Sequence, residues 1–390
     1  MPVAVRQRLP TWLLALAFTT FAFATDDYII AGVLPAISAD LGVSEAAGGQ
    51  FVTVFSIAFA LAAPVASVVT ATWPRRGLLT GALALFVVAN WVAAFTSSYA
   101  LLMGLRVLAA VAAAAVVPAA YAIATTLAPE GRQGRYLTLV MGGLTGSLAL
   151  GVPIGTWVGG AFGWQATFGL GGALGLVALV AIRRTLPETP PAPAMPIRDR
   201  LAPLAGPRVL LGLLGIVAIV LGSMMVLTYL APLLRDLAGV GSVELGWVFV
   251  LAGLAGFAGG QFGGRAADRW GSDRALIIGV VGFAAAMAVF SACWFLRPVP
   301  LLALLPLLVF WAAVSWWIPP PAQTRLLALA GPAGPQALAL NSSAVYVGVS
   351  AGGAAGGLVL DGHGSGWLPA VSAGVELVAL ALFWLAGRVK

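Results

Sequence analysis

Few residues in this chain of 390 could do ionic or acid–base chemistry inside an apolar environment. Asp26 and Asp27 are adjacent near the end of the first long apolar segment, Arg106 interrupts the fourth, and Glu376 interrupts the last. A charged side chain at the centre of a membrane helix costs roughly 2.5 to 3.5 kcal/mol on insertion scales, so such residues are usually functional. We expect a site for protons among them.

Other kinds of site chemistry find no support in the sequence. Cys293 is the only cysteine and His363 the only histidine, so neither an internal disulfide nor a Cys/His metal site is expected. No G-x-x-x-x-G-K-[ST] phosphate-binding loop occurs, which argues against an ATP-driven pump. We therefore expect no enzyme, no cofactor and no metal. The net charge of +7 comes from arginines in short loops and indicates no nucleic-acid partner.

Composition places these residues in a membrane protein. Hydrophobic residues make up 61% of the chain and charged residues 8%, whereas soluble domains carry about 25% charged residues. The expected surroundings are therefore a lipid bilayer. Arg6 and Arg8 precede the first apolar segment, and Ala22-Phe23-Ala24 resembles a signal-peptide cleavage site. The many later apolar segments favour a first anchor helix over a cleaved signal peptide.

Twelve apolar segments are long enough to cross a bilayer, since a spanning helix needs about 20 residues. A polar, proline-rich linker at 186–207 separates six spans from six. This predicts an N-terminal six-helix bundle over 1–185 and a C-terminal one over 208–390. The spans are expected at 10–34, 46–71, 77–96, 99–127, 136–160, 165–184, 208–232, 244–267, 274–295, 299–318, 334–360 and 366–387.

The basic residues are distributed unevenly between the two sets of loops. Seventeen fall on one side of the predicted membrane, and only Arg235 and Arg297 fall on the other. Because basic residues accumulate in cytoplasmic loops, both termini and the linker are predicted to be cytoplasmic. An even number of spans independently requires both termini to lie on one side.

The two halves repeat. An offset of 198 residues aligns Arg76 with Arg274, and the same offset aligns Thr70 with Asp268. Two bundles of the same orientation imply a pseudo-twofold axis along the membrane normal.

The loop after the eighth span carries Gly264, Asp268, Arg269, Gly271 and Arg274 in the order G-x-x-x-D-R-x-G-x-x-R. This order resembles the short loop motif of the major facilitator superfamily. The resemblance implies an all-α membrane protein with the major facilitator fold, in which this loop is a conformational switch. Its aspartate would accept from a neighbouring helix N-terminus or an arginine. An ordinary basic loop would explain the arginines but not the glycine and the aspartate.

The equivalent loop after the second span departs from the motif. Ala66 and Thr70 stand where the family has glycine and aspartate. We expect the N-terminal switch either to use Thr70 with Arg75 and Arg76 or to be weak.

The fifth span carries Gly151, Pro153 and Gly155 within a stripe of glycines. The stripe resembles the fifth-helix motif of antiporters of the superfamily, here in a G-V-P-x-G order. Glycines permit close helix packing, and Pro153 removes one backbone hydrogen bond and permits a bend. We expect this span to take part in the conformational switch.

The run from Thr25 to Ser44 resembles the first helix and loop of the twelve-span drug:proton antiporters, especially the sugar- and drug-efflux branch. In this resemblance Asp27 is the coupling acid and Tyr28 the aromatic residue after it. Adjacent helical residues point about 100° apart, so Asp26 and Asp27 cannot both face one cavity, and Asp26 becomes the flank. The alternative is that both acids lie in the outer headgroup region.

Arg106 resembles the arginine of the family's fourth-helix motif, although the motif's glutamine and glycine are replaced. Asp27 and Arg106 are both expected in the outer halves of their spans. We therefore predict that they form a pair in which Arg106 holds Asp27 ionised, alternating with a protonated state. The alternative for Arg106 is a side chain that extends to the outer interface. For Glu376 a structural bond to a backbone group of the eleventh span is preferred over a second titratable site.

Large adaptable side chains in the spans are candidates for a substrate cavity. Methionine and aromatic side chains suit amphiphilic ligands, although they more often serve packing. The candidates are Tyr28, Met225, Tyr229, Trp311, Trp316 and the polar Asn341.

The resemblance implies a monomeric transporter in a bacterial cytoplasmic (inner) membrane. It would export a small-molecule substrate, either drug-like or a sugar, in exchange for protons by alternating access. A facilitator or proton symporter for a small polar nutrient is the alternative, but it predicts more amide and hydroxyl groups than the spans contain. A membrane receptor is a second alternative, for which no soluble signalling domain is present in the sequence.

Overall fold

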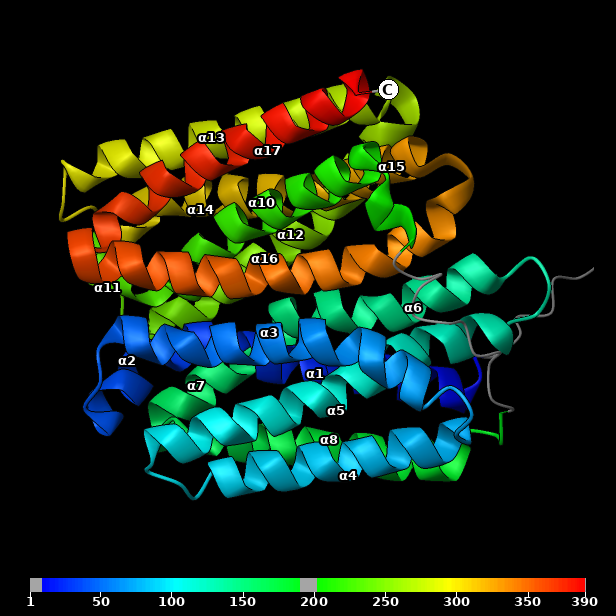
Figure 1. The fold of residues 1–390 in the computed structure, drawn as a ribbon. Coiled ribbons are helices and arrows are strands. Elements are labelled where there is room, and N and C mark those ends of the chain that lie inside the picture. Colours follow the sequence, from blue (N-terminus) through cyan, green and yellow to red (C-terminus); the bar gives the residue numbers. More distant parts are fainter. Residues whose placement is uncertain (1–8, 190–201, 390) are drawn as a thin grey trace, which may run out of the picture.

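The computed structural model describes residues 9–189 and 202–389, which form an almost entirely helical chain (Figure 1). Most of the linker predicted at 186–207 lies outside the described residues, so the domain boundaries stay a prediction. The basic residues outside the description are Arg6, Arg8, Arg198, Arg200 and Lys390.

The first half of the chain forms one bundle, blue to green in the lower part of Figure 1. In it α3 packs on α5, α4 on α8, and α1 on α6. Its elements are α1 (Thr11–Tyr28), α2 (Ile30–Leu41), α3 (Glu45–Val69), α4 (Arg75–Ala93), α5 (Tyr99–Thr126), α6 (Gln133–Gly146), the π-helix η1 (Ser147–Gly151), α7 (Val152–Phe162) and α8 (Gln165–Thr185).

The second half forms the upper bundle of Figure 1, in which α10 packs on α16 and α17, and α12 packs on α14. Its long elements are α10 (Pro207–Thr228), α11 (Leu230–Ala238), α12 (Ser242–Trp270), α13 (Ser272–Trp294), α14 (Leu301–Trp317), α15 (Pro319–Ala330), α16 (Gly334–His363) and α17 (Leu368–Arg388). Short 3-10 turns are η2 (Ala202–Ala205), η3 (Gly331–Ala333) and η4 (Ser365–Trp367).

Eleven helical segments of the described chain are long and apolar enough to cross a membrane, and the bent pair α1–α2 makes a twelfth. The predicted fold class and number of spans are confirmed. The two bundles meet along two seams, α3 against α16, and α12 against α7 and η1. We call the end of the molecule with the α3–α4 and α12–α13 loops the basic side. The end with α2 and α11, at the left of Figure 1, is the opposite side.

The first span of each half is broken near its end. α1 ends at Tyr28 and α2 continues after it at an angle of 42°. α10 and α11 are likewise interrupted at Tyr229. Both continuations end at a glycine in the left-handed conformation, Gly42 and Gly239, which glycine adopts without steric cost. The predicted span ends at 34 and 232 fall inside α2 and α11, because a count of apolar residues finds the membrane-crossing part of a helix and not its extension.

The tenth span also continues beyond its predicted end at 318. α15 begins directly after α14, at Pro319 and Pro320. Proline is tolerated in the first turn of a helix, where its missing N–H has no intrahelical acceptor. The prolines therefore begin a second helix instead of ending the span.

The glycine stripe of the fifth span packs closely against α1; the sequence predicted close packing but not the partner helix. A Cβ added at Gly151 would overlap the side chain of Thr25, and one added at Gly155 would overlap Ile29. The π-helical turn η1 ends two residues before Pro153, where the sequence predicted a bend. Close approach of these two helices therefore depends on glycine at these positions.

Gly151→Ala should destabilise the first bundle. The added methyl group has no space beside Thr25, and overpacking of this kind costs about 1–3 kcal/mol. Gly142→Ala is a matched control in the same span, because nothing lies within 4 Å of its added Cβ. We expect a lower melting temperature in detergent for Gly151→Ala alone. Equal melting temperatures for the two variants would contradict the packing described here.

Candidate functional site

Two carboxylates are buried at the break in the first span. Asp26 and Asp27 lie in the last turn of α1, and their side chains are 1% and 3% exposed. α2 continues the span for 12 residues beyond them. The acids are therefore enclosed by protein, which contradicts the alternative that they lie in the outer headgroup region.

Arg106 forms its ion pair with Asp26. Its Nη1 donates to Asp26 Oδ2 at 2.6 Å, and both side chains are almost completely buried. The guanidinium carbon also lies 4.4 Å from the centre of the Phe55 ring, a cation–π contact. The predicted Asp27–Arg106 pair is therefore wrong, and so is the alternative of an arginine that extends to the interface.

The direction of each carboxylate explains this correction. Asp26 points into the first bundle, where Asn90 of α4 and Gly171 of α8 also lie. A Cβ added at Gly171 would be 3.0 Å from Asn90 Oδ1 and 3.3 Å from Asp26 Oδ1. Because neighbouring residues on a helix point about 100° apart, Asp27 cannot share this position. The depth of the two residues along the helices was inferred from sequence, but the facing direction was not.

Asp27 lies at the junction of the two bundles. Tyr346 of α16, in the second bundle, interacts electrostatically with Asp27 and with two phenols of the first bundle, Tyr28 and Tyr121. The Tyr346 ring stacks on Phe59 of α3, with centroids 3.7 Å apart. Asp27 Oδ1 is buried without a hydrogen-bond partner in the described chain. Asp27 is therefore buried beside the Asp26–Arg106 pair, and Tyr346 of α16 is near enough to interact with it electrostatically.

Glu376 is completely buried in α17, with a hydrogen bond to α10. Ser223 Oγ donates to Glu376 Oε1 at 3.2 Å, and Gly222 leaves room for the carboxyl group. The predicted bond to the eleventh span is therefore wrong, because α17 packs on α10 and α13.

The two tryptophans proposed for a cavity pack inside the second bundle. Trp311 meets Phe290 edge to face, at an interplanar angle of 87°, and Trp316 lies against Gly256 of α12. This is the packing role that the sequence left open for them. Asn341 of α16 is buried, and its Oδ1 has no hydrogen-bond partner among the described residues.

Met225 and Tyr229 are fully buried where α10 breaks. The Tyr229 hydroxyl donates to the carbonyl oxygen of Gly353 at 2.8 Å. Both residues therefore fill the contact between α10, α16 and the first bundle.

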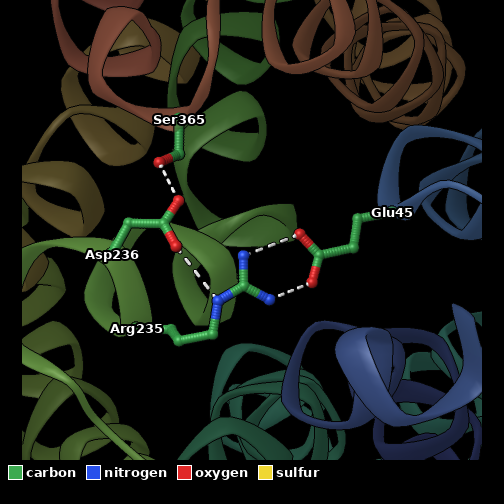
Figure 2. Close-up of polar contacts among 4 residues, drawn as sticks. All are labelled: Glu45, Arg235, Asp236 and Ser365. Atoms are coloured by element: carbon green, nitrogen blue, oxygen red, sulfur yellow. Dashed lines mark hydrogen bonds and ion pairs between the residues drawn. The ribbon is translucent and has the colours of Figure 1, made fainter. Parts of the chain in front are cut away.

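A charged clasp joins the bundles at the opposite side (Figure 2). Arg235 of α11 donates to both carboxylate oxygens of Glu45, the first residue of α3. Its Nε donates to Asp236 Oδ1 at 3.0 Å, and Ser365 Oγ donates to Asp236 Oδ2 at 2.7 Å. The hydrogen bonds to Glu45 raise the pKa of Arg235, so the guanidinium stays charged.

The two predicted switch loops on the basic side make contacts within their own bundles. Arg75 donates to the carbonyl of Ala71 at 3.2 Å, and Arg76 donates to the carbonyl of Arg183. In the other loop the ion pair is Asp273 with Arg325, at 2.9 Å. The motif residues Asp268, Arg269 and Arg274 are exposed, and Gly264 lies close to Pro320. No ion pair of Asp268 is found in the described chain, so the predicted switch contact is not made in this conformation.

Up to twelve spans in two bundles, with an ion pair buried inside the first bundle, describe a multi-span membrane protein. A profile of the Major Facilitator Superfamily matches residues 16–334 and 212–390. A chloramphenicol resistance protein of Streptomyces lividans is 34% identical over 381 residues, which are 96% of this chain and 94% of the relative. A chloramphenicol efflux pump of Mycobacterium tuberculosis is 31% identical over 386 residues, with 96% and 91% covered.

The chain belongs to the Major Facilitator Superfamily. The solved structure of a D-xylose-proton symporter matches with a TM-score of 0.78 at 17% identity, over 96% of this chain and 97% of that one, which shows the shared fold. The resemblance seen in the loop and span motifs is thereby confirmed at the level of the superfamily.

Several residues of the site were missed by the sequence reasoning. Tyr121 and Tyr346 are isolated aromatics in apolar spans, and nothing in their spacing connects them with Asp27. Of the clasp residues, Arg235 was only counted among the loop charges and Glu45 was not considered. Arg235 did carry a usable signal, because it is one of only two basic residues on its side of the membrane.

Asp26→Asn should destabilise the protein far more than Asp27→Asn. The first change removes the carboxylate to which buried Arg106 donates its hydrogen bond, and removal of one partner of a buried pair costs about 3–5 kcal/mol. The second change removes a carboxylate that has no ion pair. We expect a much lower melting temperature in detergent for Asp26→Asn than for Asp27→Asn. The double variant Asp26→Asn/Arg106→Leu should recover part of the lost melting temperature. Equal losses in the two single variants would show that the pair is assigned wrongly.

Proposed function

We propose that this chain exports small drug-like or amphiphilic molecules, or sugars, in exchange for protons. Asp27 is the proton-binding acid, and Asp26 with Arg106 forms a fixed pair beside it. The observation that carries the proposal is the buried Asp27 at the junction of the bundles, with one carboxylate oxygen unpaired. Glu376 keeps a structural role, since its carboxyl group contacts α10 and not the junction.

Charge counting supports this division of roles. With both acids ionised, the cluster of Asp26, Asp27 and Arg106 holds one uncompensated negative charge. A buried charge without a partner is costly, with an effective penalty of several kcal/mol. One proton on Asp27 removes that charge without disturbing the ion pair. A cluster that is neutral only when protonated is suited to binding and releasing one proton per cycle.

The contacts between bundles support alternating access. The clasp and the contact of Tyr229 lie between the middle of the spans and the opposite side, and the stack of Phe59 on Tyr346 lies near the middle of α3 and α16. On the basic side the Asp268 contact is not made. This arrangement fits a state closed toward the opposite side, and exchange with a second state would move the two bundles as bodies.

The names of two relatives favour export. Both refer to chloramphenicol, and one is called an efflux pump, so phenicols are the first compounds to test here. We further propose a monomer in the bacterial cytoplasmic membrane, with the basic side facing the cytoplasm. Proton symport of a nutrient is the alternative, and the same experiment separates the two.

Asp27→Asn should abolish proton-driven transport and leave passive exchange. Purified protein in liposomes is given a pH gradient, and both chloramphenicol uptake and internal pH are recorded. Wild-type protein should move chloramphenicol against the proton flux. An asparagine cannot release a proton, so the variant should exchange labelled for unlabelled substrate without responding to the gradient. Asp361→Asn, an exposed acid of α16, serves as the control and should behave like wild type.

Substrate movement that is indifferent to the gradient in wild-type protein would remove the antiport proposal. Movement of substrate with the protons, into the same compartment, would instead support the symport alternative.

A further inference from the structure

Tyr229 occupies a position between the bundles that only glycines can provide. It is the single residue between α10 and α11, and its side chain is completely buried. The ring belongs to the second bundle but reaches α3 of the first. Tyr229 therefore contacts both bundles, which would have to separate for the opposite side to open.

On the second-bundle side the ring lies in a cradle on α16. Its hydroxyl donates to the carbonyl of Gly353, and a Cβ added at Gly356 would be 2.6 Å from ring carbon Cε2. A Cβ added at Gly357 would be 2.8 Å from the hydroxyl oxygen. The ring is thus fixed by a hydrogen bond and by close backbone contact, and it cannot turn aside within its own bundle.

On the first-bundle side the ring meets Gly49. A Cβ added there would overlap the hydroxyl oxygen of Tyr229, and it would also come within 2.6 Å of ring carbon Cε1. One turn deeper on α3, Thr53 Oγ1 lies against Gly353 and is buried without a hydrogen-bond partner. The two bundles are therefore in direct backbone contact around this ring.

The charged clasp lies at the ends of the same elements. Glu45 is one turn before Gly49 on α3, and Arg235 is six residues after Tyr229 on α11. Figure 2 shows how Arg235 joins Glu45 to Asp236 and Ser365. The Arg235 side chain is 46% exposed, so this ion pair is solvated and contributes little to stability. The clasp alone is too weak to hold the bundles together.

We infer that Tyr229 is the plug that closes the opposite side of this transporter, and that Gly49 is the position where it seats. The plug stays with the second bundle when the bundles separate, because Gly353, Gly356 and Gly357 belong to that bundle. The clasp of Glu45 with Arg235 covers the plug from outside. This inference rests on the proposed alternating access and adds the residues that set which side is open.

The test uses a single cysteine beneath the plug. Cys293→Ser removes the only natural cysteine, and Thr53→Cys places a thiol one turn below Gly49. A membrane-impermeant maleimide is applied to the opposite side in liposomes, and the labelling rate is measured. Gly49→Ala prevents the ring from seating, so it should raise this rate at least tenfold. Gly356→Ala displaces the same ring from the other bundle and should have the same effect.

Gly362→Ala on α16 is the matched control, since no atom lies within 4 Å of its added Cβ, and its labelling rate should equal that of the parent. Unchanged labelling in both Gly49→Ala and Gly356→Ala, in protein with parental melting temperatures, would overturn the inference. Melting temperatures that fall by several degrees in both would likewise overturn it, because the glycines would then serve folding and not closure.

The labelling readout needs no substrate and no pH gradient. If wild-type protein shows no proton-coupled transport but the two alanine variants are labelled faster, the inference about Tyr229 is supported and the proposed function is contradicted. If transport is proton-coupled but the labelling rates are unchanged, the proposed function is supported and the inference about Tyr229 is contradicted.

Discussion

The ion pair of Asp26 with Arg106 is the constraint on which the rest of the structure depends. A guanidinium that is 2% exposed in a membrane-embedded bundle must have a carboxylate beside it, and Asp26 provides one at 2.6 Å. α1, α4, α5 and α8 are held in the arrangement that encloses this pair. Because Asp26 fixes the rotation of α1, the side chain of Asp27 points about 100° away from that of Asp26. The position of Asp27 at the junction therefore follows from satisfying Arg106, and not from contacts of its own.

Glycine sets how closely the bundles and helices approach. Because glycine has no side chain, backbones approach closely in two places. One is inside the first bundle, where α1 meets the fifth span, and the other is between the bundles around Tyr229. Inside the bundle the contact is permanent. Between the bundles the proposed alternating access requires the contact to form and break, and backbone contact there would close the interface with few strong polar bonds. Close packing without strong polar bonds suits an interface that has to open in a transporter, since strong bonds there would slow its opening.

Sequence alone predicted the number of spans and the superfamily, because hydropathy and short-range motifs are local properties. It also identified the charged residues of the site. It failed on their pairing, since Asp26 and Asp27 differ only in the direction they face, and that direction is set by Arg106, 80 residues away. It failed on Glu376 because the partner of α17 is chosen by packing of the whole bundle. For the same reason the sequence could not predict the contacts of Tyr121, of Tyr346 and of Tyr229 with Gly49, since each joins distant segments of the chain.

The π-helical turn in the fifth span has a consequence for helix register. Along the contact with α1, Gly146 lies opposite Phe21 and Gly151 lies opposite Thr25, so one helix uses five residues where the other uses four. Further on, Gly155 lies opposite Ile29, and the steps are equal again. A π turn accommodates one extra residue. The glycines after the turn therefore still face α1, as the glycines before it do. η1 thus works as a one-residue insertion that keeps the glycine faces on both sides of it aimed at the helix that carries the acids.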